Sequence, residues 1–406
     1  MSNLSFMDKL LDGVAVEWKA LGDERFFEIA NSGRRPVKAS LRELGETPYY
    51  GANNIQDYVE GYTHDGEFVL IAEDGSASLE NYSIQYVNGK FWANNHVHVV
   101  RGMSGMNTRF LYHYLSIVNF IPFLTGGERA KLTKGSMVEI QIPIPCPENP
   151  GKSLAIQAEI VRILDAFTEL TTELTTELTT RKKQYNYYRD KMLGFEGGDV
   201  EWKTLGDVTE KWYSGGTPTA GNPAYYDGGD IPWLRTQEVR FSDIESTEVK
   251  ITPSALKNSA AKWIPENCVI IAISGATAGR SAINKIPLTT NQHCGCLEID
   301  RAKALYRYVF HWVSYNYENI KALGQGARGD LNSSIIKGFK LPIPYADDPE
   351  KSLAEQARIV AILDKFDTLT NSISEGLPRE IALRQKQYEY YRDLLLSFPK
   401  PEEVEA

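Results

Sequence analysis

The sequence predicts an α+β fold in which two globular domains are separated by two long helices packed as an antiparallel coiled coil, with a pseudo-twofold internal repeat. The sequence contains an internal duplication, and such self-similarity indicates a repeated architecture. VEWKALGD at residues 16–23 returns as VEWKTLGD at 200–207, and IPIP at 142–145 returns as LPIP at 341–344. Between these shared blocks lie Gly- and Tyr-rich stretches with short β-prone runs, which indicate mixed globular domains.

The repeats also set the expected domain boundaries. Residues 1–150 form the first globular domain, with residues 1–15 packing against the distal helix, and 151–197 form a central spacer helix. Residues 198–348 form the second globular domain, and 349–406 form the distal helix and tail. The opening string DKLLDGVAVEW resembles DKMLGFEGGDVEW between the two halves, so we expect the repeat to close on itself. Two tandem domains in a row are the alternative.

Each half ends in a run with helical periodicity. KSLAIQAEIVRILDAFTEL (152–170) and KSLAEQARIVAILDKFDTL (351–369) place apolar residues at steps of three and four, which marks one stripe of a helix. Ser153 is the expected N-cap of the first helix. In the second helix Gly376 and Pro378 interrupt the pattern, where we expect the helix to end or kink. A coiled coil between two chains is the alternative to internal pairing.

A repeated tetrapeptide, TELT, occupies residues 168–179 of the first helix. Each unit adds about 6 Å of helix, so the segment suits a ruler, and a spacer without function is the alternative. The tails RKKQYNYYRD and RQKQYEYYRD follow the two helical runs. The residues expected to serve the helix pair or a partner protein are Leu170, Leu174, Leu178, Tyr185, Tyr188, Tyr388 and Tyr391.

Composition limits the class of protein. No leader peptide and no stretch of about 18 apolar residues is visible, and the four cysteines are too few for a disulfide framework, so a cytoplasmic location without membrane contact is expected. The net charge of −9 argues against a protein that binds DNA without partner proteins, because phosphate groups are bound mainly by Lys and Arg. Such a chain must concentrate its cations locally or rely on a partner.

Catalytic signatures are missing from the sequence. It has no phosphate-binding loop of the G-x-x-x-x-G-K-[ST] type, and NPAY at 222–225 lacks the second proline of the adenine methyltransferase motif. EWK at 17–19 matches a nuclease tripeptide but lies in a repeated strand, and HCGC at 293–296 lacks the further ligands of a zinc site. We therefore expect no catalytic residue, no metal and no cofactor in this chain.

Side chains suited to DNA gather in the first variable segment. Asn can read adenine and Arg guanine through paired hydrogen bonds, and Lys and Arg can hold phosphates. The alternative for each Asn is an ordinary turn, and for each cation a solvated surface. The candidates are Arg34, Arg35, Lys38, Tyr49, Tyr50, Asn53, Asn54, Lys90, Trp92, Asn94, Asn95, Arg129 and Lys131.

The second variable segment carries a similar set. Its Gly-Gly turn would allow the backbone to approach a ligand closely, although an ordinary tight turn has the same composition. The candidates are Ser214, Gly215, Thr217, Arg235, Thr236, Gln237, Ser274, Thr277, Arg280, Asn291, Gln292 and Arg328.

With these residues in view, the chain resembles the specificity subunits of type I restriction–modification systems, close to the type IC branch. The resemblance covers essentially the whole length. It rests on the paired VEWK-x-LGD strings, the paired SLA-x-Q-A-x-IV-x-ILD-x-F helices, the QY-x-YYRD tails and the TELT triplet. PYYGANNI, GKFWANNH and SGGTP also resemble strings of the target-recognition domains in this family.

The resemblance implies a non-catalytic reader of double-stranded DNA. Each target-recognition domain would read one half of an asymmetric split site in the major groove, with a spacer of roughly seven base pairs. The helices would recruit two modification (methyltransferase) subunits, which bind S-adenosylmethionine, and motor–nuclease subunits, which use ATP and Mg. Base-reading residues differ between members of the family, so the candidate residues above rest on their chemistry alone. A coiled-coil scaffold with two ligand-binding domains and no DNA role is the rival hypothesis.

Overall fold

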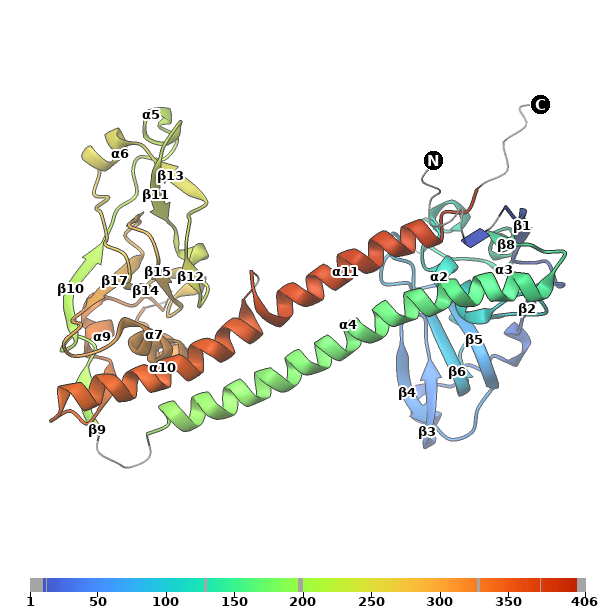
Figure 1. Cartoon of the computed structure of the whole chain (residues 1–406), viewed down its shortest axis with the longest axis horizontal. Coiled ribbons are helices and arrows are strands. Elements are labelled where there is room, and N and C mark those ends of the chain that lie inside the picture. The colour runs from blue at the N-terminus through green and yellow to red at the C-terminus, as the bar shows by residue number, and fades with distance from the viewer. Residues whose placement is uncertain are drawn as a thin grey trace. The chain divides into compact units, whose positions relative to one another are not determined.

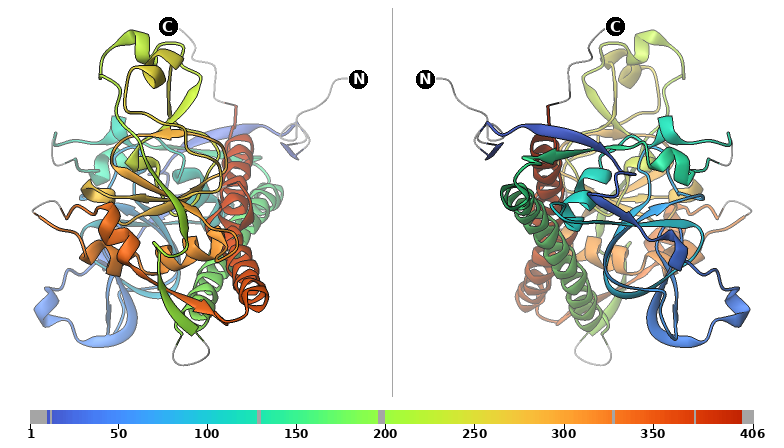
Figure 2. Two further views of the ribbon diagram at one scale, coloured as in Figure 1. Left: turned by 90° about the vertical axis from the view of Figure 1, so that its left-hand side faces the viewer. Right: turned by 90° about the vertical axis from the view of Figure 1, so that its right-hand side faces the viewer.

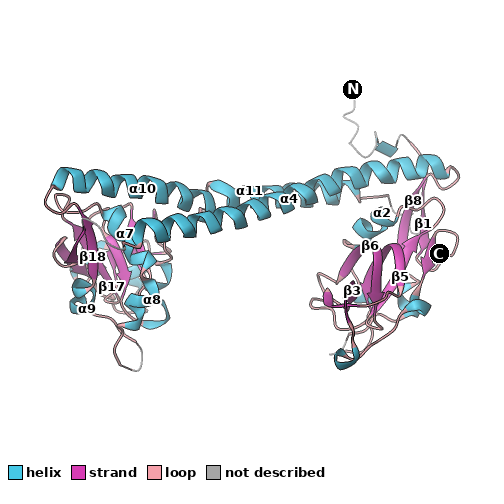
Figure 3. Cartoon of the chain, turned by 90° about the horizontal axis from the view of Figure 1, so that it is seen from below, coloured by secondary structure: helices cyan, strands magenta, loops and turns pink. Residues whose placement is uncertain are grey.

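The computed structural model describes residues 10–11, 13–127, 130–195, 200–326, 329–372 and 374–399, which form two compact units (Figure 1). The first unit combines the residues up to Thr175 with those from Glu380 onward, and the second contains Thr176–Arg379. Each unit mixes helices and sheets, as Figure 3 shows by colour. The predicted α+β class with two globular domains is confirmed.

Strands from the repeated strings pair with each other in each unit. In the first unit β1 (Val16–Ala20) pairs antiparallel with β8 (Gln141–Pro145). In the second unit β9 (Val200–Thr204) pairs antiparallel with β18 (Lys340–Pro344) in the same register. In both pairs the Trp of the EWK tripeptide lies opposite the first Pro of the partner strand. The tripeptide is thus a repeated structural element.

The main sheet of the first unit has six strands. Strands β3 and β6 run parallel, and the other neighbours run antiparallel. In spatial order the strands are β2 (Phe27–Ile29), β7 (Val97–Gly102), β5 (His64–Ala72), β6 (Ile84–Ala93), β3 (Leu44–Tyr50) and β4 (Ile55–Val59). Short helices lie at η1 (Asn31–Gly33), η2 (Ala39–Leu41), η3 (Ile121–Phe123) and α3 (Lys134–Met137).

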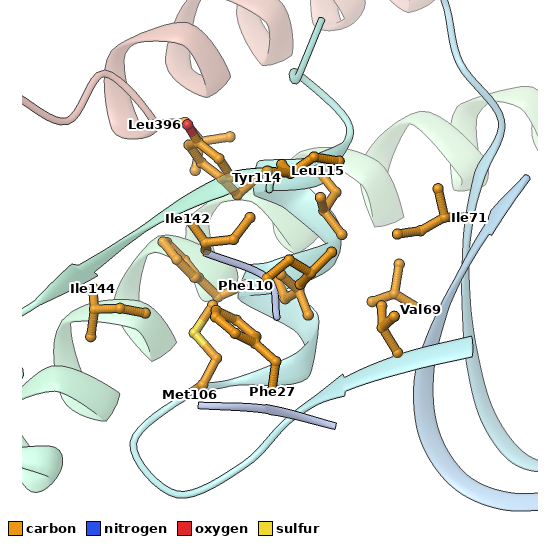
Figure 4. Packing of buried hydrophobic residues seen from close by; sticks show 14 of the residues in the cluster. Phe27, Val69, Ile71, Met106, Phe110, Tyr114, Leu115, Ile142, Ile144 and Leu396 are labelled. Carbon is orange, nitrogen blue, oxygen red and sulfur yellow. The ribbon is translucent and has the colours of Figure 1, made fainter. Parts of the chain in front are cut away.

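Helix α2 (Thr108–Leu115) belongs to the core of this unit. Its N-cap is Asn107, whose side chain accepts a hydrogen bond from the Phe110 backbone N. Figure 4 shows Phe110 in one apolar cluster with Val69 and Ile71 of β5. The last five residues of β5, at 68–72, are all buried and apolar without alternation.

The second unit has a five-stranded and a three-stranded sheet. The first contains, in order, β10 (Thr209–Ser214), β17 (Cys294–Ile299), β14 (Val269–Ala272), β15 (Ser281–Asn284) and β12 (Asp243–Ile244). The second contains β13 (Val249–Ile251), β11 (Ile231–Leu234) and β16 (Thr289–Thr290). Helices α7 (Tyr306–Tyr315), α8 (Tyr317–Ala322) and α9 (Ser333–Gly338) accompany the larger sheet, with short helices η4 (Thr236–Glu238) and η5 (Gly275–Thr277) in its loops.

A small lobe of the second unit is built on the three-stranded sheet. Helices α5 (Pro223–Tyr226) and α6 (Pro253–Lys257) pack on it around Trp233 and Ile251. The left view of Figure 2 shows this lobe in yellow-green at the top. It has its own apolar cluster, separate from that under α7.

Three long helices complete the units. In the first unit the early part of α4 (Pro150–Leu193) packs against α11 (Gly376–Leu395), and the ring of Phe167 stacks on that of Tyr391 with 5.2 Å between centroids. In the second unit the late part of α4 packs against α10 (Pro349–Asn371). The expected interruption near Gly376 and Pro378 is confirmed, because α10 ends at residue 371 and α11 begins at 376. Among the described residues, no helix is long and apolar enough to cross a membrane.

The expectation that Ser153 caps the first long helix is wrong. Asn149 precedes the helix, and its side chain accepts a hydrogen bond from the backbone N of Lys152 at 3.1 Å. Asp348 caps α10 in the same way. Ser153 lies one turn further on and is buried, where its Oγ accepts a hydrogen bond from Gln157 Nε2 at 2.9 Å.

The repeated glutamine of the SLA-x-Q motif fastens each long helix to its domain. Gln157 accepts a hydrogen bond from the backbone N of Asn107 at 2.8 Å and donates one to the Gly105 carbonyl at 2.9 Å. Gln356 makes the equivalent pair of bonds in the second unit, to the backbone around Leu305. Both glutamine side chains are buried, so these bonds form in a low-dielectric interior and fix the helix position.

The strings that follow QY-x-YYRD close the two apolar cores. Equivalent residues of the two tails enter the two clusters, namely Leu395, Leu396 and Phe398 in the first and Met192, Leu193 and Phe195 in the second. Leu10, Leu11 and Val14 pack against the first cluster, while residues 1–9 lie outside the described part. The first core therefore depends on residues at the end of α11 and just after it.

Candidate nucleic-acid interface

Three loops meet beside the C-terminal end of β5 in the first unit. They are the turn at Asp74–Gly75, the turn Asn94–His96 between β6 and β7, and the segment closed by the bridge between Thr125 and Lys131. Backbone hydrogen bonds join them, from Glu73 N to His96 O at 2.8 Å and from Leu132 N to Glu73 O at 2.7 Å. We call this arrangement the three-loop site.

The second unit contains the same three-loop site beside the end of β14. Its loops are the turn at Ser274–Gly275, the turn Asn291–His293, and the segment closed by the bridge between Gln325 and Asp330. The backbone bonds recur, from Ile273 N to His293 O at 2.9 Å and from Leu331 N to Ile273 O at 2.7 Å. The two domains thus share a local framework although their sequences differ.

The middle turn of each site is an Asn-x-His turn. The Asn94 side chain accepts a hydrogen bond from the backbone N of His96 at 2.8 Å, and Asn291 accepts the same bond from His293 N at 3.0 Å. Both asparagines are buried, with 3% and 8% of their surface exposed. Each is therefore the residue that shapes the turn, as asparagine commonly does. The residue between them and the histidine, Asn95 or Gln292, is exposed.

The histidine of each turn is tied to the first loop. His96 Nδ1 bonds with the Asp74 carboxylate, and His293 Nδ1 bonds with Ser274 Oγ at 2.6 Å. Parallel strands support the turn from the other side, because the Asn94 backbone N donates to Tyr50 O and the Asn291 backbone N donates to Leu234 O, both at 3.3 Å. The residue at the tip of the turn, Asn95 or Gln292, therefore lies between two residues that are both fixed by hydrogen bonds.

Glu73 neutralises two of the predicted phosphate-binding cations. Arg34 Nη1 lies 2.6 Å and Lys131 Nζ 2.9 Å from its carboxylate. Burial raises the pKa of Glu73, but the hydrogen bonds from Arg34 and Lys131 outweigh burial and hold that pKa below its ordinary value. Arg34 also donates to the Val97 carbonyl at 2.8 Å. Both cations therefore stabilise the loop framework.

The aromatic candidates of the first unit are largely structural. Tyr49 is buried, with the Arg42 guanidinium 4.1 Å from its ring centre, and burial raises the pKa of the half-buried Tyr50. Trp92 Nε1 donates to the Arg35 carbonyl at 2.6 Å. Lys90 lies over the ring of Tyr62.

The remaining candidates of the first unit lie around the site. Asn53 fastens the first loop, because its Nδ2 donates to Gly75 O at 2.9 Å and its Oδ1 accepts from Ala77 N at 2.8 Å. The side chains of Arg35, Lys38 and Asn54 are exposed. Arg129 lies outside the described residues, as does Arg328 in the second unit.

In the second unit the Gly-Gly turn approaches the protein itself. A Cβ added to Gly215 would lie 1.7 Å from the Thr290 carbonyl oxygen of β16, so the close approach that glycine permits is to this strand. Beside it, Ser214 ends β10 and Thr217 Oγ1 donates to Gln292 Oε1 at 2.7 Å. This turn thereby adjoins the tip of the three-loop site.

The other candidates of the second unit lie in two neighbouring turns. Arg235 is ion-paired with Glu248 at 2.6 Å and precedes η4, which contains Thr236 and Gln237. Thr277 and Arg280 lie in the turn after β14, where the Arg280 backbone N donates to Thr277 O. The strand pairing makes β11 the counterpart of β3, so Arg235–Gln237 occupy the place that Gly51–Asn53 hold in the first unit.

Comparison with known proteins identifies the family. Residues 15–181 and 198–383 match the family model described as the type I restriction modification DNA specificity domain. The chain belongs to this family.

Known specificity subunits are similar to this one over its whole length. It is 46% identical over 98% of its length to a putative type I restriction enzyme specificity subunit of Haemophilus influenzae, of which 99% is covered. It is 40% identical to the specificity subunit of the Escherichia coli type I restriction enzyme EcoR124I/EcoR124II, with 100% of each covered. A crystal structure of a type I restriction–modification S subunit from M. genitalium shares the fold, with a TM-score of 0.65, 13% identity and coverage of 96% and 98%.

Sequence reasoning missed the two histidines of the specificity subunit's three-loop sites and the partner Asp74, whereas Ser274 was among the predicted residues. A signal was present, since NNH at 94–96 and NQH at 291–293 both follow a β-prone run and a strand ending at a glycine turn. The number of residues between the glycine turn and the tripeptide differs in the two halves, so a simple alignment does not show that NNH and NQH are equivalent.

The HCGC string of this specificity subunit begins one residue before β17 and enters the buried strand. His293 is exposed and Cys294 and Cys296 are buried, and burial raises the pKa of the Cys294 thiol to about 12. Within the described part of the chain, no group of three or more His, Cys, Asp or Glu side chains is arranged to hold a metal ion.

Proposed function

We propose that this specificity subunit reads an asymmetric split DNA site, with each recognition domain contacting one half-site. The duplicated three-loop site supports this proposal above all other features. Two domains with one loop framework but different surrounding residues suit the reading of two different short sequences. Specificity follows from base edges, whereas phosphate contacts fix register. Neither domain needs to bind tightly alone if partner subunits contribute basic surface, which accommodates the net charge of −9.

The partners in this proposal are two modification subunits, which methylate adenine and bind S-adenosylmethionine, and motor–nuclease subunits that use ATP and Mg. The chain itself would be non-catalytic. Tyr187 and Tyr390, at equivalent positions of the two tails, have 61% and 65% of their surface exposed. Large exposed aromatic side chains are common anchors in protein interfaces, and a surface present twice suits two copies of one partner.

The TELT units would set the gap between half-sites. Each unit adds about 6 Å of helix, which is close to the rise of two base pairs at 3.4 Å each. Rotation about the helix axis changes with each unit too, so the effective step along DNA need not equal the rise. We propose a spacer of roughly seven base pairs for the three units in this chain.

The decisive experiment is a genome-wide map of N6-methyladenine in cells that express this chain with its modification subunit, beside cells that lack the chain. We expect a split motif with a fixed gap near seven base pairs. Removal of one TELT unit should shorten the gap and leave both half-sites unchanged. Chain-independent methylation, or none from an assembled complex, would contradict the proposal and favour the scaffold hypothesis.

A further inference from the structure

We propose that Asn95 and Gln292 are specificity-determining residues that each read an adenine in the half-site of their own domain. This inference rests on the proposed function and deepens it. In each three-loop site two residues of the Asn-x-His turn are exposed. The histidine ring is bonded through Nδ1 to the first loop, and the side chain before it is a carboxamide in both sites. Asn94 and Asn291 are the positioning residues that shape the turn.

The side chains at the two tips have the chemistry that recognition of adenine requires. A carboxamide carries one acceptor oxygen and one donor nitrogen side by side, which match the N6 donor and N7 acceptor of adenine in the major groove. The flanking residues differ between the two domains, with Ala93 and Val97 around the first turn and Thr290 and Cys294 around the second. The tip amide is thus shared by position and chemistry while its surroundings are not.

The amide of Gln292 keeps hydrogen-bonding capacity for a base. Gln292 Oε1 accepts one bond from Thr217 at 2.7 Å, and its Nε2 lies 3.1 Å from His293 Nε2. Since an amide oxygen has two lone pairs and an amide nitrogen two hydrogens, one acceptor site and one donor remain for a base. His293 accepts this bond when its proton lies on Nδ1, facing Ser274. Gln292 is therefore oriented before it meets DNA, and less side-chain entropy is lost on binding.

The first domain holds its tip differently. The Asn95 carbonyl oxygen accepts a long contact from Arg34 at 3.5 Å, and within the described residues no hydrogen bond of its side-chain amide is formed. Asn has fewer rotatable side-chain bonds than Gln, so less entropy is lost when its amide is fixed and fewer hydrogen bonds are needed to orient it. Beside it, the Asp74 side chain is 39% exposed. A carboxylate next to a phosphate would be repelled, which favours base edges over the sugar–phosphate backbone as the neighbour of this turn.

Three cations near the two sites are already paired with carboxylates. Arg34 and Lys131 are paired with Glu73, and Arg235 is paired with Glu248. Arg34 or Arg235 would therefore have to break an ion pair before its guanidinium could bind a guanine base. Two exposed side chains lie at equivalent points of the two sites. The histidine rings are bonded through Nδ1 to the first loop, whereas the amides of Asn95 and Gln292 keep both donor and acceptor capacity.

The test compares methylation motifs of the full chain assembled with its modification subunit. The variants are Asn95→Ala and Gln292→Ala, and the controls are the exposed amides Asn88→Ala and Asn258→Ala, which lie outside the three-loop sites. Each test variant should relax one adenine position in the half-site of its own domain. Discrimination at that position should fall by roughly 5- to 150-fold, the loss expected for one bidentate base contact.

Further outcomes separate the possible failures. Asn95→Gln and Gln292→Asn keep the amide and should retain adenine preference in part. If the parent complex methylates a split motif but both alanine variants keep that motif, or relax a position that is not adenine, the inference is wrong. Loss of methylation at every site by an assembled variant would also overturn it, since the turn would then be structural. If the parent complex methylates no split motif, the proposed function itself fails.

Discussion

Arg109 of α2 and Asp165 of α4 form an ion pair with 2.8 Å between Nη2 and Oδ1. The pair recurs in the second unit, where 2.6 Å separates Nη2 of Arg307 from Oδ1 of Asp364. A histidine one turn after each arginine bonds to the same aspartate. The aspartate of the repeated ILD string thus joins the recognition domain to the long helix in both units. Burial raises the pKa of Asp165, but bonds from Arg109 and His113 outweigh burial and lower it overall.

Replacing this aspartate should destabilise its own unit. Asp165→Asn removes the charge that Arg109 and His113 face, and we expect a loss of about 1–2 kcal/mol after allowance for solvent around the partly exposed carboxylate. Denaturant unfolding monitored by tryptophan fluorescence measures the change. Glu159→Gln, which breaks an exposed ion pair on the same helix, should have little effect. Equal losses in the two variants would contradict this role.

The first unit should lose stability in mild acid. Burial lowers the pKa of His98, and burial also lowers that of His113 despite its bond to Asp165. A histidine whose pKa is depressed on folding contributes stability above its ordinary pKa and loses it as the pH falls through the folded value. The free energy of unfolding should therefore fall as pH decreases below about 6.5. The double variant His98→Gln, His113→Gln should flatten this dependence, and an unchanged slope would contradict it.

Gly215 should tolerate no side chain. Its Cβ would lie 1.7 Å from the Thr290 carbonyl oxygen, so Gly215→Ala must displace β10 or β16. We expect destabilisation of the second unit by about 3 kcal/mol and loss of the second half-site. Gly338→Ala, where no atom lies within 4 Å, is the matched control for unfolding measurements. Wild-type stability of Gly215→Ala would show that the turn can shift freely.

The exposed tail tyrosines should govern assembly. Tyr187→Ala and Tyr390→Ala should each weaken the binding of one of two modification subunits by about tenfold or more. The double variant should then bind neither at concentrations that saturate the parent. Native mass spectrometry of the mixture gives the stoichiometry directly. Unchanged two-to-one complexes from the double variant would place the partner surface elsewhere.

Leu396 should stabilise the first unit although it lies near the end of the sequence. It is 3% exposed within the core that holds Phe110 and Ile160. Leu396→Ala should cost about 2–5 kcal/mol in the first unit. Hydrogen exchange read separately for the two units can locate the loss, and Leu394→Ala, at a less buried site, serves as the control. A loss confined to the second unit would contradict the assignment.

The sequence was sufficient to predict the duplication, because closely similar strings form equivalent elements. The VEWK and IPIP strings became the two-stranded sheets, and the SLA-x-Q-A runs became α4 and α10. The cap of α4 was misassigned because serine is a common N-cap. Asn149 and Asp348, four residues before the two serines, are the better signal, and the serine itself faces the domain.

The candidate site was less predictable because it depends on contacts distant in sequence. Nothing in the basic run that includes Arg34 reveals that Glu73 would bind it across 39 positions. Nor does composition distinguish Asn94, which is buried and shapes a turn, from Asn95, which is exposed at its tip. The distinction follows from which backbone N–H each side chain can reach. It becomes visible only when β6 and β7 are placed in the sheet.

The discontinuity of the first unit has a consequence for the order of events during synthesis. Ribosomes deliver residues up to 175 first, yet the core they form also needs Leu395, Leu396 and Phe398. The second unit, which uses a continuous stretch of chain, is synthesised in full before the residues that complete the first. Folding by N-terminal domain first is the common order for multidomain chains. Here the nascent first domain must wait, with part of its apolar core open, until the last helix emerges.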